Sequence, residues 1–450
     1  MGKNLKNRLQ HIRNLNPGKT QYPLERKEPA SGSVFSAQKS ILDSIEDSLQ
    51  DSGDFPGSAW ITAGHQVLKR TVKTNLPLPV PSVFPNSLAI AVPDFLKYCR
   101  MPVPEDLVFF DLETTGLSGG AGTLAFLGSF GRFRTGGIVI EQYLLLDYPG
   151  EGDFLEALMN EFAKSKSPSN PVLIVSYNGK TFDSQIFKNR CLMNGIVPPD
   201  YFHADLLHPS RRLWKKILPD CSQGTIETAV LGLDRMGDVP GALAPEIWFS
   251  FLKTGQTQAL TGICDHNIKD IRGLASICLL LAKITSAPIK MLDTCPFDFE
   301  ALALLWRETA RYRSGLRSKL PGKHFMPEWF SCEEEKTTAA ILLAEAARRL
   351  MPRSLYVLGL DLLKTDTEQG RYLLAKLLSS AVDAADDLKA LALRALAMDA
   401  LYRLRNLGTA LEYTESALAL PGIKKSLKED LEHRKERLNK KILPDKKEEK

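Results

Sequence analysis

The chain reads Phe109-Phe110-Asp111-Leu112-Glu113-Thr114-Thr115-Gly116-Leu117, which places two acidic residues at the end of an apolar run. Because alternate side chains of a strand share one face, Asp111 and Glu113 are expected to point the same way. Two like charges that close are costly unless a cation or a proton lies between them. Carboxylate oxygens suit Mg²⁺ or Mn²⁺, so the pattern indicates a metal site. For this motif taken alone, a strand end with two solvated acids is the commoner explanation.

Two further motifs change that preference. A second apolar run leads into Ser176-Tyr177-Asn178-Gly179-Lys180-Thr181-Phe182-Asp183, and a later segment reads Cys264-Asp265-His266-Asn267-Ile268-Lys269-Asp270. In this order, the three motifs resemble the RNase H-like DEDD 3′–5′ exonuclease superfamily. In detail, their residues are similar to those of the YprB-like ribonuclease-H-like domain proteins.

Connecting segments carry the closer likeness: Asp205-Leu206-Leu207-His208-Pro209, Arg211-Arg212-Leu213-Trp214, Thr225-Ile226-Glu227 and Asp238-Val239-Pro240-Gly241. The resemblance covers roughly residues 100–285. It implies an α/β fold, an RNase H-like mixed sheet flanked by helices. It also implies a metal-dependent nuclease, a 3′–5′ exonuclease that hydrolyses the phosphodiester bonds of DNA or RNA.

The resemblance further implies a reaction that uses two divalent ions, Mg²⁺ or Mn²⁺, about 4 Å apart. The matching positions supply four carboxylates as metal ligands and catalytic residues: Asp111, Glu113, Asp183 and Asp270. His266 completes the catalytic set as a general base, because imidazole titrates near neutrality.

His266 and Asp270 are four residues apart, so they share a face if they lie on a helix. Histidine-type members of the superfamily carry one more residue between these positions, and the spacing here is that of tyrosine-type members. An alternative interpretation of His266 is a polar residue at a helix start. Asp183 is also expected to be the N-cap of a helix over residues 182–194, a role compatible with metal binding.

Four residues beside these motifs are expected to contact the substrate: Thr114, Asn178, Lys180 and Phe182. A basic segment over residues 208–218 has two interpretations. Its arginines and lysines could grip phosphates while Trp214 stacks on a base, or the segment is a helix with a solvated basic face and Trp214 in the core.

Composition is that of a soluble globular protein, with 44% hydrophobic and 25% charged residues and a formal net charge of +5. Seven scattered cysteines without a C-x-x-C pair disfavour structural zinc and favour reduced thiols. The N-terminus lacks a secretory pattern, and the longest apolar stretch, near residues 274–284, is too short to span a bilayer. We therefore expect a cytoplasmic protein without a membrane partner.

Five segments are expected along the chain: a flexible basic N-terminus (residues 1–55), a lead-in with a proline-rich linker (56–100), the RNase H-like exonuclease domain (101–290), an α-helical repeat-like domain (295–422) and a charged, solvated tail (423–450). Strands are expected over residues 107–112, 123–133, 137–147, 171–176 and 201–206, with helices between and after them. The three successive strands followed by alternation with helices predict a mixed sheet.

Helical periodicity persists over residues 337–420, and the run Leu404-Arg405-Asn406-Leu407-Gly408 resembles part of a tetratricopeptide-repeat hairpin. A plain helical bundle explains this all-α region equally well. Either form could hold a protein partner. A rival to the nuclease is therefore a non-catalytic scaffold that binds nucleic acid or protein through the nuclease fold and the helices.

Overall fold

The computed structural model describes residues 33–50, 57–98, 100–116, 122–164, 172–313 and 333–442. The chain divides into two units, Met1–Ile45 and Glu46–Lys450. Helix α2 (Ser33–Gln50) begins in the first unit, and the sheet and all later helices belong to the second. The spacing of Leu5, Leu9, Ile12 and Leu15 predicts one face of a short helix, but these residues lie outside the described part of the chain.

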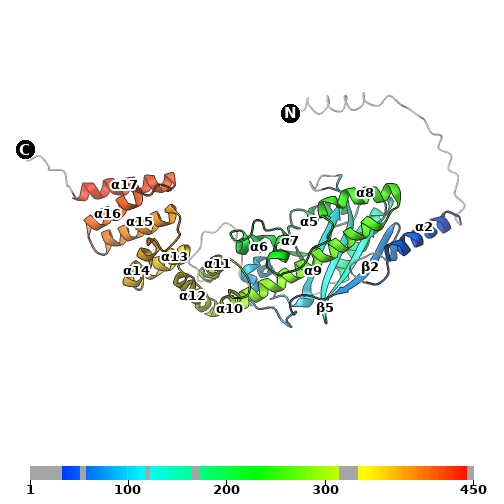
Figure 1. Cartoon of the computed structure of the whole chain (residues 1–450), viewed down its shortest axis with the longest axis horizontal. Coiled ribbons are helices and arrows are strands. Elements are labelled where there is room, and N and C mark those ends of the chain that lie inside the picture. Colours follow the sequence, from blue (N-terminus) through cyan, green and yellow to red (C-terminus); the bar gives the residue numbers. More distant parts are fainter. Residues whose placement is uncertain are drawn as a thin grey trace, which may run out of the picture. The chain divides into compact units, whose positions relative to one another are not determined.

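A seven-stranded mixed sheet is the centre of the second unit, with strand order β1-β2-β5-β4-β3-β6-β7 (Figure 1). The strands are β1 (Ile61–Gly64), β2 (Val67–Thr74), β3 (Leu107–Thr114), β4 (Ala125–Arg134), β5 (Gly137–Leu145), β6 (Leu173–Ser176) and β7 (Phe202–Asp205). The first five in spatial order pair antiparallel, and β6 and β7 join β3 in parallel. The mixed α/β sheet expected from the sequence is confirmed.

The lead-in contributes two strands to this sheet. The apolar residues between 59 and 67 predict one strand-like piece, whereas the structure has a hairpin of β1 and β2, and β2 continues to Thr74 and pairs with β5 along its whole length. Lys69, Arg70 and Lys73 interrupt the apolar pattern of β2, although Val67, Leu68 and Val72 are fully buried. The charged residues therefore concealed a buried strand.

Helices cover both faces of the sheet. They are α3 (Leu88–Ala91), α4 (Glu151–Lys164), α5 (Asp183–Met193), α6 (Leu207–Trp214), α7 (Gln223–Ala229), α8 (Ala244–Thr254), α9 (Gln258–Ser286) and α10 (Pro288–Met291), with short 3₁₀ turns η1 (Pro93–Lys97), η2 (Pro104–Asp106), η3 (Tyr148–Gly150) and η4 (Gly241–Leu243). On one face, the Phe110 ring packs against Phe162 of α4 and Phe187 of α5. On the other face, the long helix α9 contacts β3, β4 and β5.

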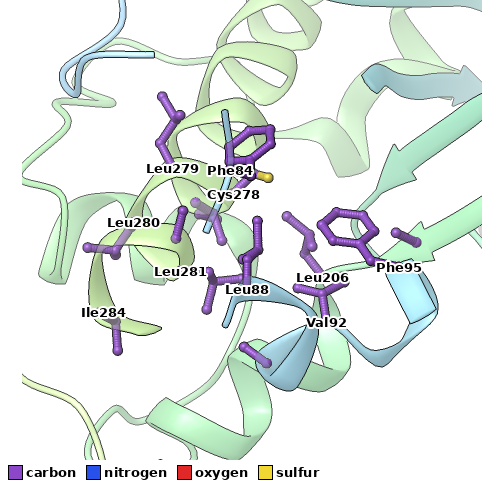
Figure 2. Packing of buried hydrophobic residues seen from close by; sticks show 14 of the residues in the cluster. Phe84, Leu88, Val92, Phe95, Leu206, Cys278, Leu279, Leu280, Leu281 and Ile284 are labelled. Atoms are coloured by element: carbon purple, nitrogen blue, oxygen red, sulfur yellow. The ribbon is translucent and has the colours of Figure 1, made fainter. Parts of the chain in front are cut away.

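Buried apolar side chains from the lead-in pack against the C-terminal half of α9. Figure 2 shows Phe84 and Leu88 beside Cys278 and Leu281, with Phe95 close to Leu206. These side chains are at most 2% exposed. The lead-in and α9 therefore share one core.

Trp214 belongs to this core too. It is 0% exposed, and its indole Nε1 donates a hydrogen bond to the Pro296 carbonyl at 2.8 Å. Arg212 and Lys216 are about half exposed and form ion pairs with Glu308 and Asp298. Of the two interpretations of this basic segment, the structure supports the helix with a buried tryptophan.

The close approach of α9 to β4 depends on Gly131, and we expect Gly131→Ala to destabilise the fold. An added Cβ would lie 2.4 Å from Ile271 Cγ2 and 2.9 Å from Ile138 Cδ1. Overpacking of this kind costs about 1–3 kcal/mol, which urea unfolding would detect as a lower midpoint. Gly152→Ala on α4 is the matched control, because nothing lies within 4 Å of its added Cβ. An unchanged midpoint for Gly131→Ala would contradict this packing.

The described residues after α10 contain helices and no strand, as expected for the C-terminal region. Its helices are α11 (Phe299–Arg313), α12 (Glu333–Arg348), α13 (Pro352–Leu362), α14 (Thr367–Leu377), α15 (Asp386–Tyr402), α16 (Leu407–Leu418) and α17 (Lys425–Ile442). Consecutive helices pack in pairs, most extensively α11 with α12, α13 with α14, and α15 with α16. Whether these pairs are tetratricopeptide-like stays a prediction.

The charged tail contains α17, which is not wholly solvated. Leu431 and Leu438 are at most 2% exposed and pack with Ala417 and Ala410 of α16. The many lysines and glutamates hid this narrow apolar stripe. Within the described parts of the chain, no helix combines the length and apolar character needed to cross a membrane.

Candidate metal centre

Strand β3 presents the first two acids. Asp111 is opposite Ser129 and Glu113 is opposite Leu127 on β4, so both carboxylates project from the same face. The register shifts between Glu113 and Thr114, where the strand ends. The alternation that predicted a shared face for Asp111 and Glu113 thus corresponds to the observed pairing.

The loop after β6 brings in the third acid. Asn178 has a φ of +64°, and its N–H donates to the Asp205 carboxylate at 2.8 Å. At Gly179, an added Cβ would lie 2.5 Å from Ser176 Oγ and 2.8 Å from Asp183 Oδ2, so only glycine fits. Asp183 is the first residue of α5, and Phe182 occupies the cap position. The prediction that Asp183 is the N-cap is therefore wrong by one residue: Phe182 is the N-cap and Asp183 follows it.

Helix α9 supplies His266 and Asp270 on one face. His266 Nε2 lies 3.3 Å from Asp270 Oδ2, as the four-residue spacing predicted. His266 Nδ1 is 2.9 Å from Asp238 Oδ2. Because α9 begins at Gln258, His266 is not at a helix start, which removes that alternative interpretation.

These groups converge on a pocket of about 230 Å³. Its lining residues are Asp111, Leu112, Glu113, Thr114, Tyr177, Asn178, Phe182, Asp183, Gly241, Pro245, His266 and Asp270. All five residues predicted to be catalytic line it, with three of the four predicted to contact substrate. Ligand atoms of Glu113, His266 and Asp270 lie within 4.8 Å of one another, close enough to share an ion.

Lys180 does not line this pocket. Its Nζ forms an ion pair with Asp94 Oδ2 at 2.5 Å, and its side chain is 31% exposed. Its backbone N–H donates to Asp205 at 3.2 Å. The structure thus directs the Lys180 side chain toward η1.

Electrostatics in the pocket favour a cation. Burial, together with the charges of Asp183, Asp270 and Glu113, raises the pKa of Asp111 well above its ordinary value. Burial and the charges of Asp270 and Asp183 do the same to the pKa of Glu113. For Asp183, burial and then the charges of Asp205 and Asp270 raise the pKa to about 7.

Such mutual repulsion is relieved when a divalent cation lies between the oxygens. The donor set, four carboxylates and one imidazole, is the chemistry that Mg²⁺ or Mn²⁺ accepts. The residues present therefore fit such ions.

Three residues without a predicted role also contact this cluster. The Arg235 guanidinium bonds to Asp270, to Glu227 at 2.6 Å and to Asp238 at 3.0 Å. Asn267 Nδ2 donates to Asp111 Oδ2 at 2.7 Å. Asp238 and Asn267 stood in segments that carried the resemblance, whereas Arg235 had no signal, because it lies 35 residues from Asp270.

Behind the Asn178 loop, the partly buried His203 makes stability depend on pH. Its Nε2 is 2.7 Å from Ser176 Oγ and its Nδ1 is 3.0 Å from Ser184 Oγ. Burial and the charge of Lys180 lower the pKa of His203 from its ordinary 6.5 to about 4.

The neutral folded imidazole therefore stabilises the chain above pH 6.5, and that stability declines as the pH falls toward 4. The loss is about 3 kcal/mol. We expect His203→Gln to flatten this part of the curve in urea unfolding between pH 7 and 4. Equal slopes for the two proteins would contradict the assignment.

Comparison with known proteins identifies the part of the chain that holds this pocket. Residues 108–282 match the family model of the RNase_H superfamily. A stretch of 181 residues is 38% identical to "Uncharacterized protein YprB" of Bacillus subtilis (strain 168). That alignment covers 40% of this chain and 42% of the relative, so less than half of either protein is compared.

Proposed function

Because residues 108–282 form an RNase H-like domain, we propose that the chain is a metal-dependent nuclease that hydrolyses phosphodiester bonds of nucleic acid. One observation carries the proposal: acids from β3, α5 and α9 meet in one pocket, where burial and neighbouring charge raise the pKa of Asp111, Glu113 and Asp183. Four carboxylates that repel each other weaken a fold unless they hold a cation. The finer proposal is 3′–5′ exonuclease action with two ions.

In this proposal, Asp111, Glu113, Asp183 and Asp270 hold Mg²⁺ or Mn²⁺. Bound ions of this kind polarise the phosphoryl oxygen and offset charge on the leaving oxygen. His266 accepts a proton from the attacking water at Nε2, the atom that faces Asp270.

Asp238 accepts a hydrogen bond from the protonated Nδ1 of His266, so the proton stays on Nδ1 and Nε2 is left as the free base.

Thr114, Asn178 and Phe182 are proposed to contact the substrate, because they line the same pocket. Lys180 is proposed to act differently. Its cation lies beside the pocket and is proposed to leave Asp94 and contact the nucleic-acid strand when that strand binds. Asp205 fixes the backbone of Asn178. Asn178 and the Phe182 ring would then orient the terminal nucleotide.

A cleavage assay tests the proposal. DNA and RNA single strands labelled at the 5′ end are incubated with Mg²⁺ or Mn²⁺, with an EDTA control and the Asp111→Asn protein in parallel. We expect a ladder that shortens from the 3′ end, lost with EDTA and in the variant. Asp111→Asn that cleaves as fast as wild type would overturn the assignment. A single internal cut would overturn the exonuclease proposal alone.

The second candidate is a non-catalytic scaffold, favoured by the helices α11–α17 that make up the C-terminal region. In it, the helices hold a protein partner and the nuclease fold binds nucleic acid without cutting it. Thermal shift with Mn²⁺ separates the two: a metal site stabilises the fold, and a scaffold shows no shift at millimolar metal. For either candidate, we propose a cytoplasmic location.

A further inference from the structure

Four polar side chains form one row across the sheet beneath α9. Arg70 on β2 is opposite Gln142 on β5, Gln142 is opposite Ser129 on β4, and Ser129 is opposite Asp111 on β3. Residues directly opposite each other in neighbouring strands share a face. We call Arg70, Gln142, Ser129 and Asp111 the polar row; Figure 1 shows β2 and β5 beside α9.

Hydrogen bonds connect the polar row from end to end through Asn267 on α9. Arg70 Nε donates to Gln142 Oε1 at 2.8 Å. Gln142 Nε2 donates to Asn267 Oδ1 at 3.0 Å, and Ser129 Oγ donates to the same oxygen. Asn267 Nδ2 donates to Asp111 Oδ2 at 2.7 Å. Gln142, Ser129 and Asn267 are 0% exposed, so water does not compete for these bonds.

Arg70, at one end of this chain of hydrogen bonds, fixes which amide atoms donate and which accept along it. A guanidinium only donates, so Arg70 forces the carbonyl oxygen of Gln142 toward itself. The amide nitrogen of Gln142 must then face Asn267 Oδ1, which turns Asn267 Nδ2 toward Asp111. Without Arg70 and Gln142, the Asn267 amide can rotate by half a turn and present its oxygen to a carboxylate.

Arg70 is itself held in place. Its Nη2 donates to Asp265 Oδ1 at 3.0 Å, and its guanidinium lies 4.9 Å from the Trp60 ring centre. Both Arg70 and Asp265 are at most 6% exposed. Trp60 and Arg70 lie outside residues 108–282, so these contacts tie the lead-in to the proposed metal site.

We infer that Arg70, Gln142 and Asn267 are positioning residues that aim one oxygen of Asp111 into the metal site. The inference rests on the proposed function. It assigns to β2 a role in metal affinity, because hydrogen-bonded neighbours of a ligand fix its orientation and tune its basicity.

Mn²⁺ binding tests the inference without reference to cleavage. The electron paramagnetic resonance signal of unbound Mn²⁺ gives the dissociation constant for the full chain and its variants. We expect Gln142→Met and Asn267→Leu each to weaken binding about 10-fold. Because Gln142 acts through Asn267, the double variant should bind no more weakly than the weaker single variant.

Tyr143→Phe is the matched control. Tyr143 is the next residue of β5, faces the opposite side of the sheet and donates to Glu161. Its loss should lower the melting temperature as a buried hydrogen bond does, with Mn²⁺ binding unchanged. If Gln142→Met does not fold, Ser129→Ala replaces it, with an expected loss of about 3-fold.

The outcomes separate the two proposals. A wild-type chain that binds no Mn²⁺ overturns the proposed function and this inference with it. Wild-type binding that is equally tight in a folded Gln142→Met or Ser129→Ala protein overturns the inference alone. So does a double variant whose loss is the product of the two single losses.

Discussion

Asp111→Asn is expected to lower the cleavage rate at least ~10³-fold. In the absence of metal, the same variant is expected to melt at a higher temperature than wild type. The charges of Asp183, Asp270 and Glu113 repel the Asp111 carboxylate and help to raise its pKa, so removing its charge relieves repulsion. The substituted amide still offers an oxygen to Asn267 Nδ2, which keeps the hydrogen bond. Function and stability therefore change in opposite directions.

Differential scanning calorimetry with and without Mn²⁺, beside the labelled-strand assay, measures both effects. Wild type should gain stability from Mn²⁺, and Asp111→Asn should gain much less. Asp220→Asn is the control, because Asp220 is exposed and its contacts are to Ser222 and Thr225, away from the pocket. A variant that melts lower than wild type without metal would show that the Asp111 charge stabilises the fold, contrary to this account.

Arg235→Met is expected to destabilise the metal-free chain by about 3–5 kcal/mol. The side chain is 17% exposed and contacts three carboxylates, those of Glu227, Asp238 and Asp270. Removing the guanidinium leaves these acids without their shared counter-charge. Because Asp270 belongs to the proposed metal site, Mn²⁺ should restore part of the loss and stabilise the variant more than it stabilises wild type.

Urea unfolding with EDTA and with Mn²⁺ checks this expectation. Arg212→Met is the matched control: its side chain is 47% exposed, and its partner Glu308 is 3.8 Å away, so its effect should stay within about 0.5 kcal/mol. Equal effects of the two substitutions would show that Arg235 is not the shared counter-ion of Glu227, Asp238 and Asp270. A loss that Mn²⁺ does not reduce would separate Arg235 from the metal site.

The sequence predicted the mixed sheet and the convergence of the acids for local reasons. Asp111 and Glu113 alternate on a buried strand, and His266 and Asp270 share a helix face, so each pair was set by the period of one element. The resemblance then joined these pairs to Asp183. Their roles in catalysis stay predictions.

Local sequence patterns could not predict which residues far apart in the chain become neighbours. Arg70 and Gln142 are 72 residues apart, and only the pairing of β2 with β5 makes them neighbours. Lys180 illustrates a second limit. Its position beside Asp183 was evident, but the left-handed Asn178 and the Asp205 contacts fix the loop so that Lys180 reaches Asp94. Side-chain direction in a loop depends on partners that the local sequence does not name.

The central claim is that the acids of this pocket are a divalent-metal site. Anomalous scattering from crystals of the full chain grown with Mn²⁺ tests it most directly. We expect two peaks about 4 Å apart, with oxygens of Asp111, Glu113, Asp183 and Asp270 within bonding distance. A map from well-ordered crystals without a peak in the pocket would contradict the claim.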